Sequence, residues 1–437
     1  MDKNQTQRNK KISLKELWTL FLTAAIPVIC VGGASYFPYM LRLPLMYAVG
    51  IGFILTFIFS GAKIRLNTVT TSFILFLSFI GITCLYSIDA KTSLNLFLIY
   101  LTCASLLFID LPKSVVSKIL SIMYIFCTVI AISIILSALI KNCMNTYFWF
   151  IVNPSRSPET TNAILRELSF GSYSGFAREM GEAAYIMDIG LGISFAKYFS
   201  TGKLTKSEIL ITLLFFAAVM LTGKRTMFLI PLFCICIFIA ISNLKSKLFK
   251  VIVLLFIAFI AIGAIMMFVP QMSNVINKFL DNDNMENLGG RASLWPYIFA
   301  MISQYWFFGG GFGSYNEFAY QDGLRVNGGK WEYNAHNSYF QLLGETGIIG
   351  VLLFAAFAVS ALVFTFRLIR KIKDDPDSLK LSYFSLYVQI MVLIYATTGN
   401  PLYTKQIIFT WLFSIGISLT ISRTCNKENP RSLLRNG

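Results

Sequence analysis

Residues 347–367 read GIIGVLLFAAFAVSALVFTFR, a mainly apolar stretch that ends at an arginine. An α-helix needs roughly 20 mainly apolar residues to cross the hydrocarbon core of a bilayer, and this stretch has that length. Similar stretches recur along the chain, which is 56% hydrophobic and only 13% charged over its 437 residues. Soluble domains carry about 25% charged residues. The sequence therefore predicts an all-α polytopic membrane protein.

About 12 membrane-spanning helices are predicted from these apolar runs. They cover residues 17–37, 44–61, 68–86, 94–110, 118–140, 180–199, 208–222, 226–243, 250–269, 347–367, 380–398 and 406–422. The polar, basic start of the chain leads into the first of many spans, which favours a retained helix over a cleaved signal peptide. We expect three parts: spans one to nine within 1–269, a large loop with short helices at 270–346, and three spans and a tail at 347–437.

The formal net charge of +16 is interpreted through membrane topology and not through nucleic-acid binding. About two thirds of the 37 Lys and Arg residues fall in stretches on the same side as the N-terminus. Because short cytoplasmic loops are enriched in Lys and Arg, both termini are predicted to be cytoplasmic. Three segments keep basic residues on the opposite side: about 141–179, the turn 222–226 and the loop 270–346. Topology does not explain these charges, so they are candidates for a functional site.

The loop before residue 347 contains the densest glycine cluster and the single histidine of the chain, His336. Residues 307–315 read FFGGGFGSY, and glycine permits close backbone approach and unusual dihedral angles. Residues 292–307 place apolar side chains at helical spacing, which predicts an amphipathic helix against the bundle. The loop is therefore predicted to form one face of an active site.

Lys224 and Arg225 lie together in the turn TGKRT between two predicted spans. The turn lacks the glycine spacing of a phosphate-binding P-loop. Two interpretations stay open: a snorkelling pair at the membrane interface, or an anion site, since the arginine fork binds phosphate through two hydrogen bonds. Arg291 directly follows a glycine pair and is either a loop cap or a second phosphate ligand.

Arg178 and Glu182 border the sixth predicted span. They are either interfacial or part of a site, and Glu182 inside the bundle would need a basic partner because unpaired charge is costly in a membrane. His336 is either structural or a general base near neutral pH. No nucleophile elbow of the Gly-x-Ser-x-Gly type accompanies it, and no zinc-ligand spacing is present among the eight cysteines. The sequence predicts no metal site.

These residues together resemble a known family. Lys224 and Arg225 follow a mid-chain span, Trp295 follows Arg291, and FFGGGFGSYNEF at 307–318 precedes AHNSYFQLLGETGIIG at 335–350. The pattern is similar to the O-antigen ligase and O-antigen polymerase superfamily of bacterial membrane glycosyltransferases, over about residues 170–420. The resemblance implies a GT-C-like all-helical membrane fold with a large periplasmic loop.

The resemblance also implies a chemistry. Its donor is a glycan on undecaprenyl pyrophosphate, moved to a sugar hydroxyl without a metal or other cofactor. The family's arginines fall on Arg225 and Arg291 and its histidine on His336, with Lys224 as a lesser diphosphate ligand. Such cations stabilise the charge of a leaving diphosphate, and the histidine accepts the proton of the attacking hydroxyl.

Other residues of these segments are candidates for contacts with the substrate. They are Arg178, Glu182, Tyr315, Trp331, Tyr333, Asn337 and Tyr339. At 178–182 the chain reads REMGE, where the family more usually has an asparagine, so this stretch departs from the family pattern.

Within this resemblance two functions compete. A polymerase joins lipid-linked repeat units, and a ligase moves finished glycan to lipid A-core. We expect a polymerase of the bacterial inner membrane with its active site on the periplasmic face; a chain-length regulator as a protein partner stays open. A lipid-linked oligosaccharide flippase is the alternative from another class. Transporters place ionisable residues near the bilayer midplane, whereas the unexplained charges here cluster at one face, which favours an enzyme.

Overall fold

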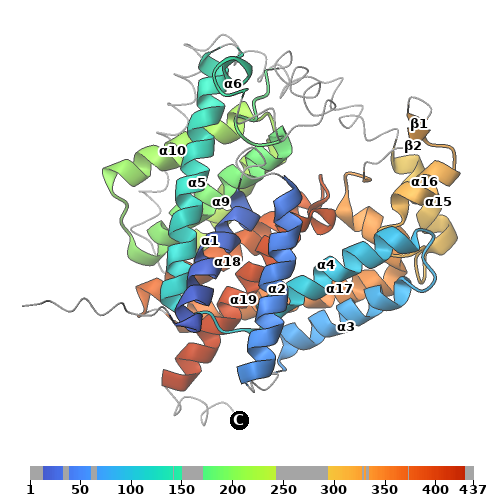
Figure 1. Ribbon diagram of the computed structural model, residues 1–437, viewed down its shortest axis with the longest axis horizontal. Coiled ribbons are helices and arrows are strands. Elements are labelled where there is room, and N and C mark those ends of the chain that lie inside the picture. Colours follow the sequence, from blue (N-terminus) through green and yellow to red (C-terminus); the bar gives the residue numbers. More distant parts are fainter. Residues whose placement is uncertain are drawn as a thin grey trace, which may run out of the picture.

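A computed structural model describes residues 13–32, 39–60, 66–140, 142–149, 171–242, 294–326, 329–330, 334–372 and 374–428. The described chain is almost entirely helical, apart from one short antiparallel hairpin in which Arg325 pairs with Lys330 (Figure 1). The elements are α1 (Leu14–Val31), α2 (Tyr39–Ser60), α3 (Thr68–Thr83), α4 (Ala90–Phe108), α5 (Lys113–Leu139), α6 (Cys143–Thr146), α9 (Met180–Thr201), α10 (Lys206–Leu221), α11 (Arg225–Ile241), α15 (Trp295–Tyr305), α16 (Tyr315–Gln321), β1 (Arg325–Val326), β2 (Gly329–Lys330), α17 (Ser338–Lys371), α18 (Pro376–Tyr395), η3 (Pro401–Tyr403) and α19 (Lys405–Glu428).

The predicted all-α polytopic fold is confirmed. Seven of the described helices are long and apolar enough to cross a membrane: α1, α2, α4, α5, α17, α18 and α19. The apolar helices α3 and α11 are shorter, and α10 has only 16 residues. Each predicted span on described residues coincides with a helix, and the one at 250–269 lies outside them. Several of the other predicted spans are helices that are shorter or more polar than these seven.

The interior of the bundle is formed by α9, α18 and α19. In the apolar windows of α18 and α19, 72% and 83% of the residues are buried, against 28% in α2. Every residue of α9 from 183 to 196 is buried. A helix that is buried on all sides belongs to the interior of a large bundle. The predicted span at 180–199 is thus an inner helix on which the others pack.

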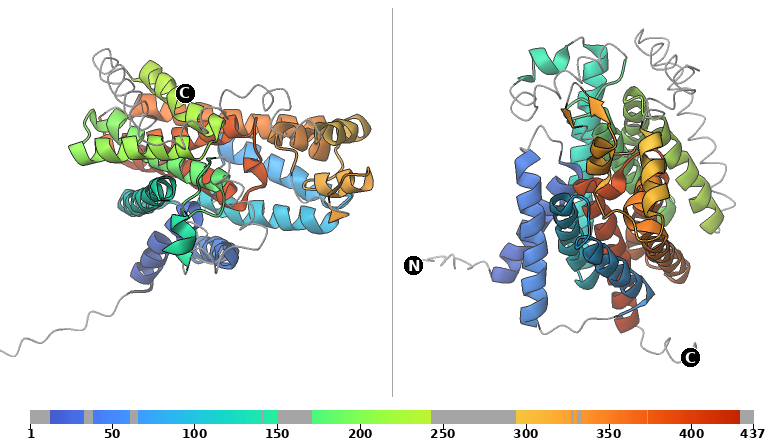
Figure 2. Two further views of the ribbon diagram at one scale, coloured as in Figure 1. Left: turned by 90° about the horizontal axis from the view of Figure 1, so that it is seen from above. Right: turned by 90° about the vertical axis from the view of Figure 1, so that its right-hand side faces the viewer.

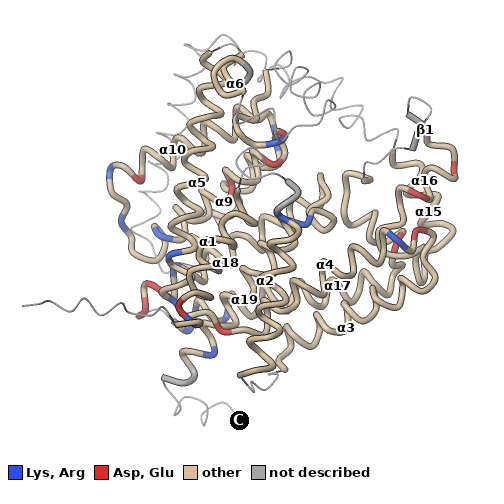
Figure 3. The backbone as a smooth tube through the Cα atoms, in the orientation of Figure 1, with Lys and Arg blue, Asp and Glu red and all other residues tan. Residues whose placement is uncertain are grey.

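Charged residues gather at one end of the bundle, which we call the ion-pair end (Figure 3). Arg423 Nη1 lies 2.8 Å from Asp110 Oδ1, and Lys113 Nζ lies 2.9 Å from Asp375 Oδ2. Although partial burial raises the pKa of the Asp375 carboxyl, hydrogen bonds from Ser378 and Lys113 outweigh it and lower the pKa to about 2. These contacts join the end of α19 to the end of α4, and the start of α5 to the start of α18.

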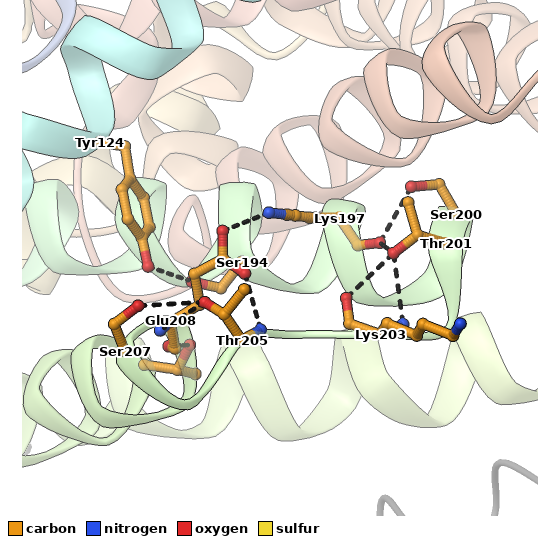
Figure 4. A network of polar contacts seen from close by, with 10 residues as sticks. Tyr124, Ser194, Lys197, Ser200, Thr201, Lys203, Thr205, Ser207 and Glu208 are labelled. Atoms are coloured by element: carbon orange, nitrogen blue, oxygen red, sulfur yellow. Dashed lines mark hydrogen bonds and ion pairs between the residues drawn. The ribbon is translucent and has the colours of Figure 1, made fainter.

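The connection between α9 and α10 adds a further ion pair (Figure 4). Thr205 caps α10 by accepting from Glu208 N, and Glu208 Oε2 accepts from Thr205 N at 3.0 Å. The other carboxylate oxygen of Glu208 binds Lys197 Nζ. This capping box satisfies two free N–H groups of the helix start, so the turn between the two helices is fixed by its own sequence.

The loop elements α15, α16 and the hairpin lie together at one extremity of the bundle (Figures 1 and 2). The predicted amphipathic helix at 292–307 is confirmed as α15, which buries Ile298 and Met301. The turn between α3 and α4 binds the glycine-rich segment, because Ile88 N donates to Gly310 O at 3.0 Å and Tyr86 Oη donates to Phe308 O at 2.8 Å. The loop is thereby fixed to helix ends that lie away from the ion-pair end.

Candidate active site

The basic turn at 222–225 and the histidine segment meet through one short stretch after α18. Thr398 Oγ1 donates to Thr226 Oγ1 at 2.9 Å, which holds the first turn of α11. Ser338, the first residue of α17, donates its N–H to Ala396 O at 2.8 Å and its hydroxyl to Gly399 O at 3.0 Å. Residues 396–399 therefore anchor Arg225, next to Thr226, and His336, two positions before Ser338. We call this region of helix ends the site end.

The start of α9 reaches the same region. A methyl group at Gly181 would lie 3.8 Å from Lys224 Cε and 3.7 Å from Tyr395 Oη. Tyr173 N also donates to Leu221 O at 2.8 Å, which joins the segment before α9 to the end of α10. The segments 178–182 and 222–226, whose charges topology does not explain, thus belong to one structural region.

Glu182 has a basic partner that the sequence interpretation required but did not identify. Arg42 Nη2 of α2 lies 2.5 Å from Glu182 Oε1, and both side chains are more than 90% buried. Arg42 also donates to Gln406 Oε1 at 2.8 Å and to Gly32 O. The other oxygen of Glu182 accepts from Arg178 N at 3.2 Å. Four helices, α1, α2, α9 and α19, are held together by this pair.

Loss of one partner of this pair should be strongly destabilising. We expect Arg42→Met to lower the free energy of unfolding by about 3–5 kcal/mol, because it leaves the Glu182 carboxylate buried and uncompensated. The double variant Arg42→Met/Glu182→Leu should recover most of that loss. Reversible denaturation in mixed micelles measures both. A double variant no more stable than Arg42→Met would show that the pair itself, and not the removal of a lone charge, determines stability.

His336 has an unusual backbone conformation. Its φ is 55°, in the left-handed region that few non-glycine residues adopt. Such a conformation costs about 1–3 kcal/mol and persists only when surrounding contacts impose it. On one side Ala335 N donates to Gln341 Oε1 at 3.1 Å, and on the other Asn337 Oδ1 accepts from the N–H groups of Tyr339 and Phe340. The half-buried His336 side chain is therefore presented by a fixed turn.

The glycine-rich segment docks onto α17 where that helix is interrupted. Gly310 N donates to Gly344 O at 3.0 Å and Gly311 N donates to Glu345 O at 2.8 Å. Gly347, with φ 62°, breaks the regular helix directly after this contact. A methyl group at Gly309 would lie 2.2 Å from the Glu345 carbonyl carbon, so only glycine permits this approach. The two glycine motifs of the sequence are thus the two sides of one interface.

Residues 210–355 match a family model described as O-antigen ligase. The match supports a relation of the chain to the O-antigen ligase and polymerase superfamily. The match covers about a third of the chain and includes the turn with Lys224 and Arg225, the glycine-rich segment and His336. No curated protein is similar enough to the chain to count as a match. Superfamily members are glycosyltransferase-like enzymes.

Some residues at the site end lie inside the range of the family match, and others lie outside it. Arg225 and His336 lie inside the matched range, and Arg42, Arg178 and Glu182 lie outside it. Arg178 has a side chain that is 37% exposed, 3.7 Å from Glu179. Arg42 was missed because the predicted second span begins at residue 44. The missed signal was an arginine in an apolar run, since a charge at such a position is rare and usually paired.

The described residues that were predicted to contact the substrate make hydrogen bonds within the protein. Tyr315 is fully buried, and its hydroxyl donates to Leu294 O at 3.0 Å. Burial raises its pKa, so it stays a neutral donor that supports the loop. Tyr339 Oη donates to Leu393 O at 2.7 Å, and Asn337 caps α17. These three side chains support the loop and the start of α17. Arg291, Trp331 and Tyr333 lie outside the described residues.

The described side chains include no group of three or more His, Cys, Asp or Glu residues placed to hold a metal ion. The segments that carry Lys224, Arg225 and His336 are joined through residues 396–399, and the start of α9 lies beside Lys224. Cations and backbone N–H groups suit an anionic ligand such as a diphosphate.

The docking of the glycine-rich segment can be tested at Gly347. A methyl group there would lie 2.1 Å from Phe307 O, in addition to the strain of a φ of 62°. We expect Gly347→Ala to lower the free energy of unfolding by more than about 1 kcal/mol and to expose the loop to limited proteolysis. Gly323→Ala is the matched control, since Gly323 has φ 100° but no atom within 4 Å. Equal effects of both changes would show that strain, and not docking, matters.

Proposed function

We propose that this chain is a surface-polysaccharide polymerase, which transfers a glycan from undecaprenyl pyrophosphate to a sugar hydroxyl of a lipid-linked repeat unit. The observation that carries the proposal is the shared anchor at 396–399, which joins the first turn of α11 to the start of α17. A basic pair and the single histidine of the chain thereby come to one end of the bundle. The superfamily match supports the same chemistry.

The proposed reaction is one in-line displacement. The acceptor hydroxyl oxygen attacks the anomeric carbon of the donor, and the bond from that carbon to the diphosphate oxygen breaks. His336 takes the hydroxyl proton as general base, which contributes about 10²–10⁴ in rate. Undecaprenyl pyrophosphate leaves with both electrons of the broken bond, and the anomeric configuration inverts. The residues assigned to this step require no metal and no nucleotide sugar.

The diphosphate has a separate set of ligands in this proposal. Arg225, at the first position of α11, and Lys224, just before it, stabilise the negative charge that develops as the sugar leaves. The start of a helix adds a favourable dipole for an anion. Arg291, within the matched range, is the third proposed ligand. The apolar outer faces of the helices provide the surface along which the polyprenyl tail extends into the lipid.

The proposed location follows from the charge distribution. The ion-pair end carries Lys113, Asp375, Arg423 and the basic end of α17. Because cytoplasmic loops are enriched in Lys and Arg, we assign this end to the cytoplasm, with both termini, and the site end to the periplasmic face of the inner membrane. A chain-length regulator is a further partner to be tested.

A ligase is the second candidate, favoured by the description of the matching family model as O-antigen ligase. A flippase is less consistent with basic groups that gather at one end of the helices.

Reconstitution separates the candidates. Protein in liposomes with purified lipid-linked repeat units should give a ladder of chain lengths. Transfer to lipid A-core without a ladder would establish a ligase. Movement of intact donor across the bilayer without glycan transfer would exclude both enzymes.

A further inference from the structure

Glu345 is a fully buried carboxylate in α17 that the proposed chemistry does not use. Its Oε2 accepts from Gly313 N at 2.7 Å, and its Oε1 accepts from Tyr315 N at 3.1 Å and from Gln341 Nε2 at 2.9 Å. Among the ion pairs between described residues, none includes this carboxylate. A buried charge is costly unless hydrogen bonds satisfy it, so backbone and amide donors take the place of a counter-ion here.

Gln341, one helical turn earlier, extends this contact toward His336. Its amide nitrogen binds Glu345 Oε1 and also donates to Asn334 Oδ1 at 3.1 Å. Its amide oxygen accepts from Ala335 N at 3.1 Å. The hydrogen bonds of this buried amide are thus directed at Glu345 and at the two residues before the histidine.

The arrangement explains how the left-handed turn at His336 is maintained. Gln341 fixes the chain before the histidine, and the Asn337 cap and the Ser338 contacts fix it afterwards. Without Gln341, only the second set would remain, and the residue could relax to an ordinary conformation. Glu345 in turn fixes the amide of Gln341 and the loop at 313–315, so one carboxylate sets the positions of both.

We propose that Gln341 and Glu345 are positioning residues, which hold His336 in its left-handed conformation and align its imidazole with the acceptor hydroxyl. This rests on the proposed function of His336 as general base. The two residues do not touch the substrate in this scheme. A reacting group displaced by about 1 Å can lose about 10²-fold in rate, so their loss should lower kcat and leave the KM for the donor nearly unchanged.

The experiment compares Gln341→Met with Gln389→Met in reconstituted full-length protein. Gln389 is a matched control, since it is equally buried and its amide binds Thr365 and Ser385 inside the bundle. We expect kcat for glycan transfer to fall about 10–100-fold in Gln341→Met, with donor KM changed less than twofold, and to stay near wild type in Gln389→Met. Glu345→Gln, which keeps the side-chain shape, should give an intermediate loss.

A second readout is independent of activity. His336 is the only histidine of the chain, so histidine labelled with ¹³C at Cε1 gives one imidazole signal when the purification tag contains no histidine. We expect Gln341→Met and Glu345→Gln to broaden this signal and shift its titration midpoint, and Gln389→Met to leave it unchanged. If Gln341→Met does not fold, Glu345→Gln carries the test.

The outcomes distinguish this proposal from the proposed function. A folded Gln341→Met or Glu345→Gln protein with wild-type kcat and an unchanged imidazole signal would overturn the positioning role, while His336 could still be the base. Full activity of His336→Asn would instead remove the base itself and with it the premise of this inference.

Discussion

His336→Asn is expected to lower the turnover number for glycan transfer by about 10²–10⁴, the usual contribution of a general base. The fold should survive, because asparagine is one of the few residues that enter the left-handed region readily, and His336 has φ 55°. Donor binding should also persist, since the proposed diphosphate ligands are on another segment. Initial rates with purified lipid-linked repeat units, together with a thermal unfolding curve, measure the effect.

The pH profile provides the control for this variant. If His336 is the base, wild-type activity falls on acidification, because protonation removes the lone pair that accepts the hydroxyl proton. The residual activity of His336→Asn should lack that part of the pH dependence. Retention of both the rate and the wild-type profile by a folded His336→Asn would assign His336 to structure alone.

Arg225→Gln is expected to lower kcat by about 10²–10³, because it removes a preorganised cation from the group where charge develops. Arg225→Lys should recover only part of the rate, since lysine keeps the charge but not the planar fork that binds two phosphate oxygens. The matched control is Arg370→Gln, in the last turn of α17 at the ion-pair end, where the guanidinium lies 4.3 Å from the Phe366 ring centroid. The same transfer assay gives all three rates.

The expected ordering is wild type, then Arg225→Lys, then Arg225→Gln, with Arg370→Gln equal to wild type. Equal losses in Arg225→Gln and Arg370→Gln, with Arg225→Lys at the wild-type rate, would indicate a general effect of surface charge. An Arg225→Gln enzyme that differs only in donor KM would limit Arg225 to ground-state binding.

The helices could be predicted from the sequence because a helix that crosses a bilayer needs a long apolar segment. The helical spacing of apolar residues in α15 also predicted that this helix is amphipathic. The roles of single polar residues were harder to predict. Tyr315 and Tyr339 have the composition of a sugar-binding surface, yet their hydroxyls bind backbone carbonyls. Propensity cannot show which way a tyrosine points, because tertiary packing decides it.

The meeting of the basic turn and the histidine segment could not be predicted either. It depends on Thr398 and Gly399, which bind Thr226 and Ser338 but have no chemical signature of their own. Only one half of the Arg42–Glu182 pair could be predicted, since a carboxylate at a helix start inside a bundle required a basic partner. Its partner was far away in the sequence, and only the packing of α2 against the interior helices brings it there.

The measurement that tests the central claim most directly is a single-turnover assay with donor lipid labelled in its polyprenyl chain, in proteoliposomes with and without acceptor. We predict that wild-type protein releases undecaprenyl pyrophosphate as glycan appears on the acceptor, with no nucleotide sugar and in the presence of a metal chelator. His336→Asn and Arg225→Gln should each slow that step. Release at the wild-type rate in both variants, or no release by the wild type in the presence of acceptor, would contradict this prediction.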